Sequence, residues 1–175
     1  MKAYIHYGSD TIDKDHSYPS KWKEAIFKPS GFWGCPVDSK ENWKEWCIGN
    51  QYYATNFSKS VTFALTNDAR VLVVTKTEDI MPYVIMDSKI SKSYSEKGIN
   101  GLGSVHSGIT LNRLKLEKHF DAIELIHGDK YDELHLNPGL FYSWDVDSIV
   151  VWNLDKVIEL TNSASKAKRR IRVCK

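Results

Sequence analysis

Residues 31–47 read GFWGCPVDSKENWKEWC, and this stretch gathers three of the chain's six tryptophans and two of its three cysteines. Its first part, FWGC, is short and apolar and predicts a short β-strand. The following DSKENWKEWCIGN predicts a helix, because Asp38 or Ser39 can accept hydrogen bonds from the first helical turn and Gly49 can follow the last turn. The stretch therefore predicts a strand that leads into a capped helix.

The predicted helix places Trp43, Trp46 and Cys47 on one face, at the i, i+3, i+4 spacing. An apolar face of this kind points inward. Aromatic side chains at helical spacing most often belong to a core. A flat aromatic surface can also hold a ring-shaped ligand, so both interpretations remain open at this point.

Five further segments have the composition of strands. They are rich in aromatic and β-branched residues, and turn-forming residues follow them. The run VLVV also predicts a strand that is buried on both faces. The segments are AYIHYG (3–8), SVTFALT (60–66), ARVLVVTK (69–76), FDAIELIHG (120–128) and SWDVDSIVVWN (143–153).

Helical patterns are fewer than strand patterns. Residues 106–119 show a helical pattern that ends at His119, and YVIMD (83–87) fits either a helix or a strand. Strands and helices do not alternate regularly, as they would in a doubly wound sheet. The sequence therefore predicts the α+β class, in a single domain over residues 1–175.

Polar segments separate or follow these elements. Residues 9–30 predict a long connection, and the glycine-rich residues 89–108 are a candidate lid over a site. Residues 161–175 form a basic tail with six Lys or Arg residues and no acidic residue. Such a tail is either a solvated chain end or a phosphate-binding segment.

Composition limits the classes of function. The net charge is +2, from 24 basic and 22 acidic residues, so no global field indicates a nucleic acid or a membrane. No stretch of about 18 apolar residues and no apolar leader occurs, so we expect a cytoplasmic protein without membrane association. The spacing of the cysteines and histidines favours neither a disulfide framework nor a metal site.

Three blocks occur in a meaningful order: a strand with His6-Tyr7-Gly8-Ser9, then the 31–47 stretch, and finally two aspartates that lead into IVVWN. This order resembles the ADP-ribosyltransferase superfamily, as found in poly-ADP-ribose polymerases and in bacterial toxins of the diphtheria-toxin type. The resemblance is distant, and it is to the prokaryotic or phage members of the superfamily. It implies an ADP-ribosyltransferase-like split β-sandwich of short antiparallel strands with flanking helices.

The resemblance also implies roles for individual residues toward NAD. His6 matches the histidine that bonds the nicotinamide ribose, and Gly8 matches the glycine whose backbone meets the carboxamide, with Tyr7 inserted between them and Ser9 after them. The tryptophans match aromatics that stack on nicotinamide, where an aromatic face contributes about 0.5–2 kcal/mol through cation–π attraction. The further implied NAD-binding residues are Gly31, Phe32, Trp33, Ser39, and Trp43 or Trp46.

The catalytic carboxylate is where the sequence departs from the family pattern. Alignment of SIVVWN with the family's last strand puts Ser148 at the glutamate position. Cleavage of the N-glycosidic bond of NAD develops positive charge on the ribose, which a carboxylate stabilises. We expect Asp147 to supply it, with Asp145 as its support or replacement, because residues two apart on a strand face the same side. A solvated strand face is the competing interpretation.

The resemblance implies an NAD-dependent ADP-ribosyltransferase that acts on a protein or nucleic-acid acceptor. Small members of the fold act as toxins or as phage-defence or counter-defence effectors, and an antitoxin or inhibitor is then a possible partner. The alternatives are an NAD glycohydrolase, a non-catalytic module that binds a nucleotide or a partner, and a small RNA-binding protein that uses the tail. Taken alone, His6 in an apolar strand also fits a core histidine.

Overall fold

The structure of the chain is a computed structural model that describes residues 1–16, 30–52, 55–86, 109–128, 141 and 144–160. The candidate lid at 89–108 and the basic tail at 161–175 lie outside the described residues, as does most of the 9–30 connection.

Seven strands form one sheet in the order β4-β7-β8-β2-β1-β3-β9. Every neighbouring pair is antiparallel except β4 and β7, which are parallel. This confirms the α+β prediction with a mostly antiparallel sheet. The strands are β1 (Ala3–Tyr7), β2 (Phe32–Pro36), β3 (Ser60–Leu65), β4 (Val71–Val74), β7 (Ala122–Leu125), β8 (Ser148–Val151) and β9 (Val157–Glu159).

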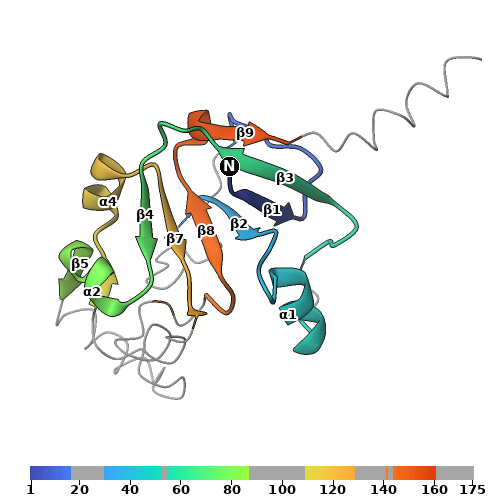
Figure 1. Cartoon of the computed structure of the whole chain (residues 1–175), viewed down its shortest axis with the longest axis horizontal. Helices are drawn as coiled ribbons and strands as arrows, with labels where there is room; N and C mark the ends of the chain where they lie inside the picture. Colours follow the sequence, from blue (N-terminus) through green and yellow to red (C-terminus); the bar gives the residue numbers. More distant parts are fainter. Residues whose placement is uncertain (17–29, 53–54, 87–108, 129–140, 142–143, 161–175) are drawn as a thin grey trace, which may run out of the picture.

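The helices of the described residues are short. Figure 1 shows α2 (Thr77–Ile80), α4 (Arg113–His119) and β5 (Val84–Met86) beside the edge strand β4, and α1 (Trp43–Gly49) below β1 and β2. The remaining elements are the strand β6 (Ile109–Leu111), which pairs with β5, and the 3₁₀ turns η1 (Met81–Tyr83) and η4 (Leu154–Lys156). The helix predicted over 106–119 ends at His119 as expected, but it begins only at Arg113, because Ile109–Leu111 form the strand β6. YVIMD contributes the strand β5.

The sheet has an apolar core on each face. Alternation along β8 divides its residues between them, since Ile149 and Val151 enter one core and Val150 enters the other. The first core contains Val74, Ile80, Leu116, Ile123, Leu125, Phe141, Trp144 and Val150. The second core contains Tyr4, Phe32, Val61, Phe63, Leu65, Ala122, Ile149, Val151 and Val157.

Strand β2 connects the two halves of the sheet. It pairs with β1 through Ile5 and Cys35 and with β8 through Phe32 and Val151. In Figure 1, β4, β7 and β8 run roughly upright, whereas β1, β3 and β9 run across the view, so the sheet turns sharply at β2. The second core lies inside this turn, since β1, β3 and β9 contribute to it together with β7 and β8.

Two strand predictions need correction. The run VLVV is not buried on both faces: among the strands that the structure describes, β4 lies at the edge of the sheet and pairs with β7 alone, and Val73 is 43% exposed. The segment 143–153 is a strand only over Ser148–Val151, so Asp145 and Asp147 precede the strand instead of lying on it. The pairing with β7 ends at Leu125 and Ser148, which removes the ladder that the longer strand requires.

Gly34 allows the second core to close against β2. A Cβ atom at this position would lie 2.6 and 2.7 Å from two ring carbons of Phe63, whose side chain is fully buried. We predict that Gly34→Ala lowers the free energy of unfolding by about 1–3 kcal/mol, because the buried ring has no space to move into. Urea denaturation measures this change.

Gly49→Ala is the matched control. A Cβ atom there meets nothing within 4 Å, so the helix propensity of alanine is expected to stabilise the fold by less than about 1 kcal/mol. Equal effects of the two substitutions would contradict the packing argument.

Candidate functional site

The three blocks of the sequence motif form neighbouring parts of the sheet. His6 lies on β1, Trp33 on the adjacent β2, and Asp147 directly before β8, which is the other neighbour of β2. The segments of His6 and Asp147, which are more than a hundred residues apart in the chain, therefore lie on the two sides of a single strand, β2. Sequence order alone does not determine this arrangement.

His6 is held by the main chain of β2. Its Nδ1 lies 2.7 Å from the carbonyl oxygen of Trp33, and a carbonyl only accepts, so Nδ1 carries the proton and Nε2 keeps a lone pair. Burial lowers the pKa of His6, although the Trp33 carbonyl opposes this shift. The ring packs 4.5 Å from that of Phe32. His6 is thus a neutral imidazole whose Nε2 can accept a hydrogen bond from a hydroxyl group.

The residues after His6 turn the chain away from β1. Tyr7 donates its hydroxyl to Asn42 Oδ1 at 3.3 Å, which ties β1 to the start of α1. Gly8 has φ +111°, a conformation that glycine adopts without steric cost, and its N–H donates to the Lys59 carbonyl at 3.0 Å. Ser9 donates its hydroxyl to the carbonyl of Thr11. The Gly8 N–H therefore already has a partner within the chain.

The cap of α1 differs from the prediction. The N-cap is Asn42, not Asp38 or Ser39: Asn42 Oδ1 accepts from the N–H groups of Lys44 and Glu45, and Glu45 accepts from the Asn42 N–H. Ser39 instead donates its hydroxyl to a nearby carbonyl. An Asn followed three residues later by Glu is a capping-box pattern, so the sequence carried this signal.

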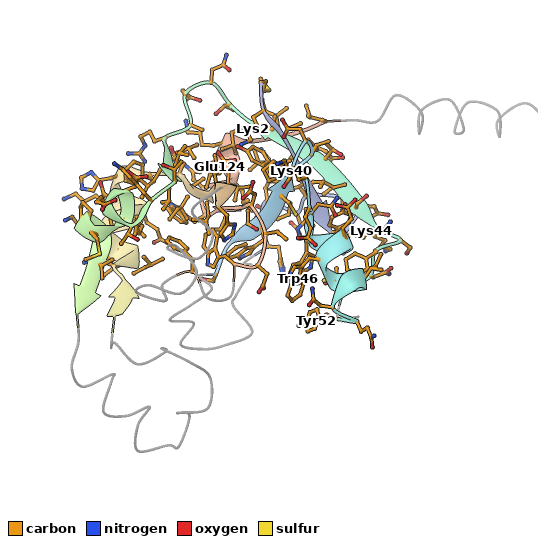
Figure 2. The ribbon with its side chains drawn as sticks, turned by 60° about the horizontal axis from the view of Figure 1, so that its bottom comes forward. Lys2, Lys40, Lys44, Trp46, Tyr52 and Glu124 are labelled. Carbon is orange, nitrogen blue, oxygen red and sulfur yellow. The ribbon has the colours of Figure 1, made fainter. Side chains whose placement is uncertain are left out.

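The tryptophans belong to two aromatic groups. Trp43 and Trp46 stack at a centroid distance of 5.0 Å and an interplanar angle of 9°, and the ring of Tyr52 packs edge-on against both. Trp33 packs instead edge-on against Trp144 at 4.4 Å, on the side of the first core. Figure 2 shows Trp46 and Tyr52 beside α1. We call Trp43, Trp46 and Tyr52 the aromatic group of α1.

Gly31 has a clear packing role. Its φ is +151°, and a Cβ atom would lie 2.5 Å from a methyl carbon of Val150 and 3.0 Å from the carbonyl oxygen of Val151. The first residue before β2 therefore has to be a glycine for β2 to approach β8 this closely.

Asp147 is a partly exposed, ionised carboxylate. Its Oδ1 accepts from the N–H of His127 at 2.8 Å and lies 3.3 Å from His127 Nδ1, and its side chain is 27% exposed. The bond from the His127 ring lowers the pKa of Asp147, with smaller contributions from the His127 N–H and from the charge of Lys2, against the effect of burial. Asp145 is half-buried nearby in sequence. Asp147 thus keeps its negative charge at neutral pH.

Lys2, Tyr4 and Glu124 form a polar group across β1 and β7, and the sequence suggested only Glu124, as a reserve carboxylate. Glu124 on β7 is buried and pairs with Lys2 at 2.7 Å. The pKa of Tyr4 is raised by burial and then by the charge and hydrogen bond of Glu124. Lys2, Tyr4 and His6 alternate along one face at the start of the chain, and this period of two was the available signal.

Within the described ranges, no group of three or more His, Cys, Asp or Glu side chains is arranged to hold a metal ion. Cys35 and Cys47 are buried thiols without a disulfide, and Cys35 Sγ accepts from the Trp43 N–H at 3.4 Å. Their contacts are those of core residues.

No protein-family model, curated protein or solved structure matches this chain. Among the residues that the structure describes, no helix is long and apolar enough to cross a membrane.

The Asn42 cap generates a testable prediction. We expect Asn42→Ala to lower the free energy of unfolding by about 1 kcal/mol, because two N–H groups of the first turn lose their acceptor. Ser39→Ala is the control and should change it by less than about 0.5 kcal/mol. Chemical denaturation distinguishes the variants, and a larger loss at Ser39 would contradict the observed cap.

The His6 geometry predicts a specific tautomer and titration. Nitrogen-detected NMR of the imidazole should show the proton on Nδ1 at neutral pH and a pKa below 6.5. Because the folded pKa is lowered, protonation favours the unfolded chain, and the associated stability is lost as pH falls below about 6.5. His6→Gln should therefore lose less stability between pH 7 and pH 5 than the unchanged protein. A proton on Nε2 would contradict the assignment.

Proposed function

We propose that the protein is an NAD-dependent ADP-ribosyltransferase on an ADP-ribosyltransferase-like split β-sandwich, and that it transfers ADP-ribose to a protein or nucleic acid. The observation that carries this proposal is the adjacency of β8, β2 and β1, the three strands that hold the motif blocks. Because no comparison connects the chain to a family, the support comes from this arrangement and from the chemistry of its residues.

The chemistry of His6 suits the ribose of NAD. Its Nε2 lone pair can accept from a ribose hydroxyl, while the Trp33 carbonyl fixes the ring through Nδ1. A neutral imidazole also adds no positive charge beside the cationic nicotinamide. His6 would thereby orient the sugar without opposing cation binding.

The chemistry of Asp147 suits the bond-breaking step. When the bond between nicotinamide and ribose breaks, the electron pair leaves with nicotinamide and positive charge develops on the sugar. A carboxylate that stays ionised can stabilise this charge and can accept a proton from the attacking acceptor or water. Its bonds to His127 hold the carboxylate in one orientation.

Ser148 supports a second candidate, the non-catalytic binding module. Its hydroxyl donates to the Val146 carbonyl at 2.8 Å, and the side chain is buried. Ser148 thus has a structural role at the turn that leads into β8. Its hydroxyl does not supply the carboxylate that the family has at this position. If neither Asp147 nor Asp145 acts on NAD, the same strands would bind a nucleotide or partner without cleaving it.

We predict that the full chain releases nicotinamide from NAD and that Asp147→Asn slows this release by about 10²–10³-fold, the usual effect of removing one electrostatic stabiliser. Asparagine keeps the acceptor for the His127 N–H, so the fold should persist. Asp155→Asn, at an exposed carboxylate on η4, is the matched control and should leave the rate unchanged. Liquid chromatography of the reaction measures nicotinamide.

The same incubation with adenylate-labelled NAD separates the candidate functions. A labelled macromolecule supports transfer, and free labelled ADP-ribose alone supports NAD hydrolysis. Calorimetric NAD binding without nicotinamide release supports the binding module. A loss confined to Asp145→Asn would transfer the carboxylate role to Asp145, and absence of both binding and cleavage would refute the proposal.

A further inference from the structure

The two oxygens of the Asp147 carboxylate have different surroundings. Oδ1 accepts the main-chain N–H of His127 at 2.8 Å and lies 3.3 Å from Nδ1 of the His127 ring. An ionised carboxylate only accepts, so this ring nitrogen carries the proton. Within the described part of the chain, Oδ2 of Asp147 accepts no hydrogen bond. The carboxylate therefore has one oxygen committed to His127 and one oxygen available.

His127 itself is held by the end of the sheet. Strand β7 ends at Leu125, but the next N–H, that of Ile126, still donates to the carbonyl of Val74 on β4 at 2.9 Å. The ladder between β7 and β8, which Figure 1 shows side by side, ends at the pair Leu125–Ser148, so His127 and Asp147 lie just beyond it. The His127 side chain is only 6% exposed. Its ring is thus a rigid support for Asp147.

The two bonds from His127 do different things. The main-chain N–H lies beyond the last ladder pair and needs an acceptor, so this bond alone would give Asp147 a purely structural role. The ring adds a second donor to the same oxygen from another direction. With one donor a carboxylate can still rotate, whereas two donors on one oxygen restrict its rotation and leave the other oxygen facing away from them.

We propose that the His127 ring is the positioning group of Asp147 and that Oδ2 is the oxygen that acts on NAD. This inference rests on the proposed function. In that reaction the bond between nicotinamide and ribose breaks with its electron pair on nicotinamide, and a lone pair of the acceptor forms the new bond to the sugar carbon. Oδ2 stabilises the positive charge on the sugar and takes the proton of the acceptor. His127 acts only through Asp147.

The charged groups around Asp147 support a dominant role for the ring. The hydrogen bond of the His127 ring is the strongest of the effects that lower the pKa of Asp147, and the charge of Lys2, which precedes β1, is the weakest. Glu124 on β7 is paired with Lys2. Asp145 precedes Asp147 by two residues and is half-buried. Loss of the ring donor should therefore change the protonation of Asp147 more than loss of Lys2.

Three substitutions of His127 in the full chain test this role, and all of them keep the main-chain N–H. His127→Asn places an amide nitrogen at the position of Nδ1, where it can donate to Oδ1. His127→Gln places its amide nitrogen at the position of Nε2, and His127→Leu has no donor. Carbon-detected NMR titration of the Asp147 carboxyl group and the pH profile of nicotinamide release are the two measurements.

His127→Leu and His127→Gln should raise the pKa of Asp147, because the ionised carboxylate loses a donor that stabilises it. The acidic limb of kcat should shift to higher pH. The value of kcat should fall by about 10- to 100-fold with little change in KM, since binding persists while Oδ2 loses its fixed position. His127→Asn should keep the pKa of the unchanged protein and most of its kcat.

A structural role alone gives a different result. Reduced stability of His127→Leu without any shift of the Asp147 pKa or of the pH profile would overturn the proposal. If His127→Leu does not fold, the comparison of the two amides decides: equal pKa values of Asp147 and equal kcat in His127→Asn and His127→Gln overturn the positioning role.

The two proposals can fail separately. If the unchanged protein releases no nicotinamide, the proposed function fails, and the NMR titration still tests whether the His127 ring holds Asp147. If Asp147→Asn slows nicotinamide release but all three His127 variants keep the normal rate and pH profile, only the positioning role is wrong.

Discussion

The turn of the sheet at β2 is the constraint on which the rest of the structure depends. One five-residue strand pairs with β1 on one side and with β8 on the other, and the second core fills the angle between the halves. Close packing here requires the absence of side chains at two positions. Gly34 leaves space for the ring of Phe63, and Gly31 leaves space for Val150. The tryptophan-rich stretch is therefore organised by its glycines.

Polar contacts reinforce the same geometry at the ends of the strands. Asp121 is 2% exposed and accepts three bonds from Arg70, two through the guanidinium and one through the N–H, and a fourth from Asn153. These bonds join the start of β4, the start of β7 and the segment after β8. Arg70 holds the pKa of Asp121 well below its usual range. Together with the Lys2–Glu124 pair, β7 has one ion pair just before its first residue and a second within the strand. Arg70 comes from the segment before β4, and Lys2 from the segment before β1.

The sequence predicted the elements well and their relations poorly. The segments at 3–8, 32–35 and 120–128 each contain a strand because apolar and β-branched residues dominate them. The edge position of β4 was not predictable from VLVV, since burial depends on which strands pair beside it. The Asn42 cap was predictable from its Glu45 partner. The NAD-binding and catalytic roles of His6, the tryptophans and Asp147 stay predictions, because they require a ligand to be tested.

The two acids near β8 illustrate why residue identity alone is a poor guide to this site. Glu124 is of the residue type that the family pattern requires, a glutamate. Its carboxylate, however, is paired with Lys2 and lies beside Tyr4. Asp147 is shorter and lies outside the strand, yet it is partly exposed and stays ionised through His127. Stabilisation of a developing cation depends on available negative charge. On that physical criterion Asp147, rather than Glu124, is the acid that fits the proposed function.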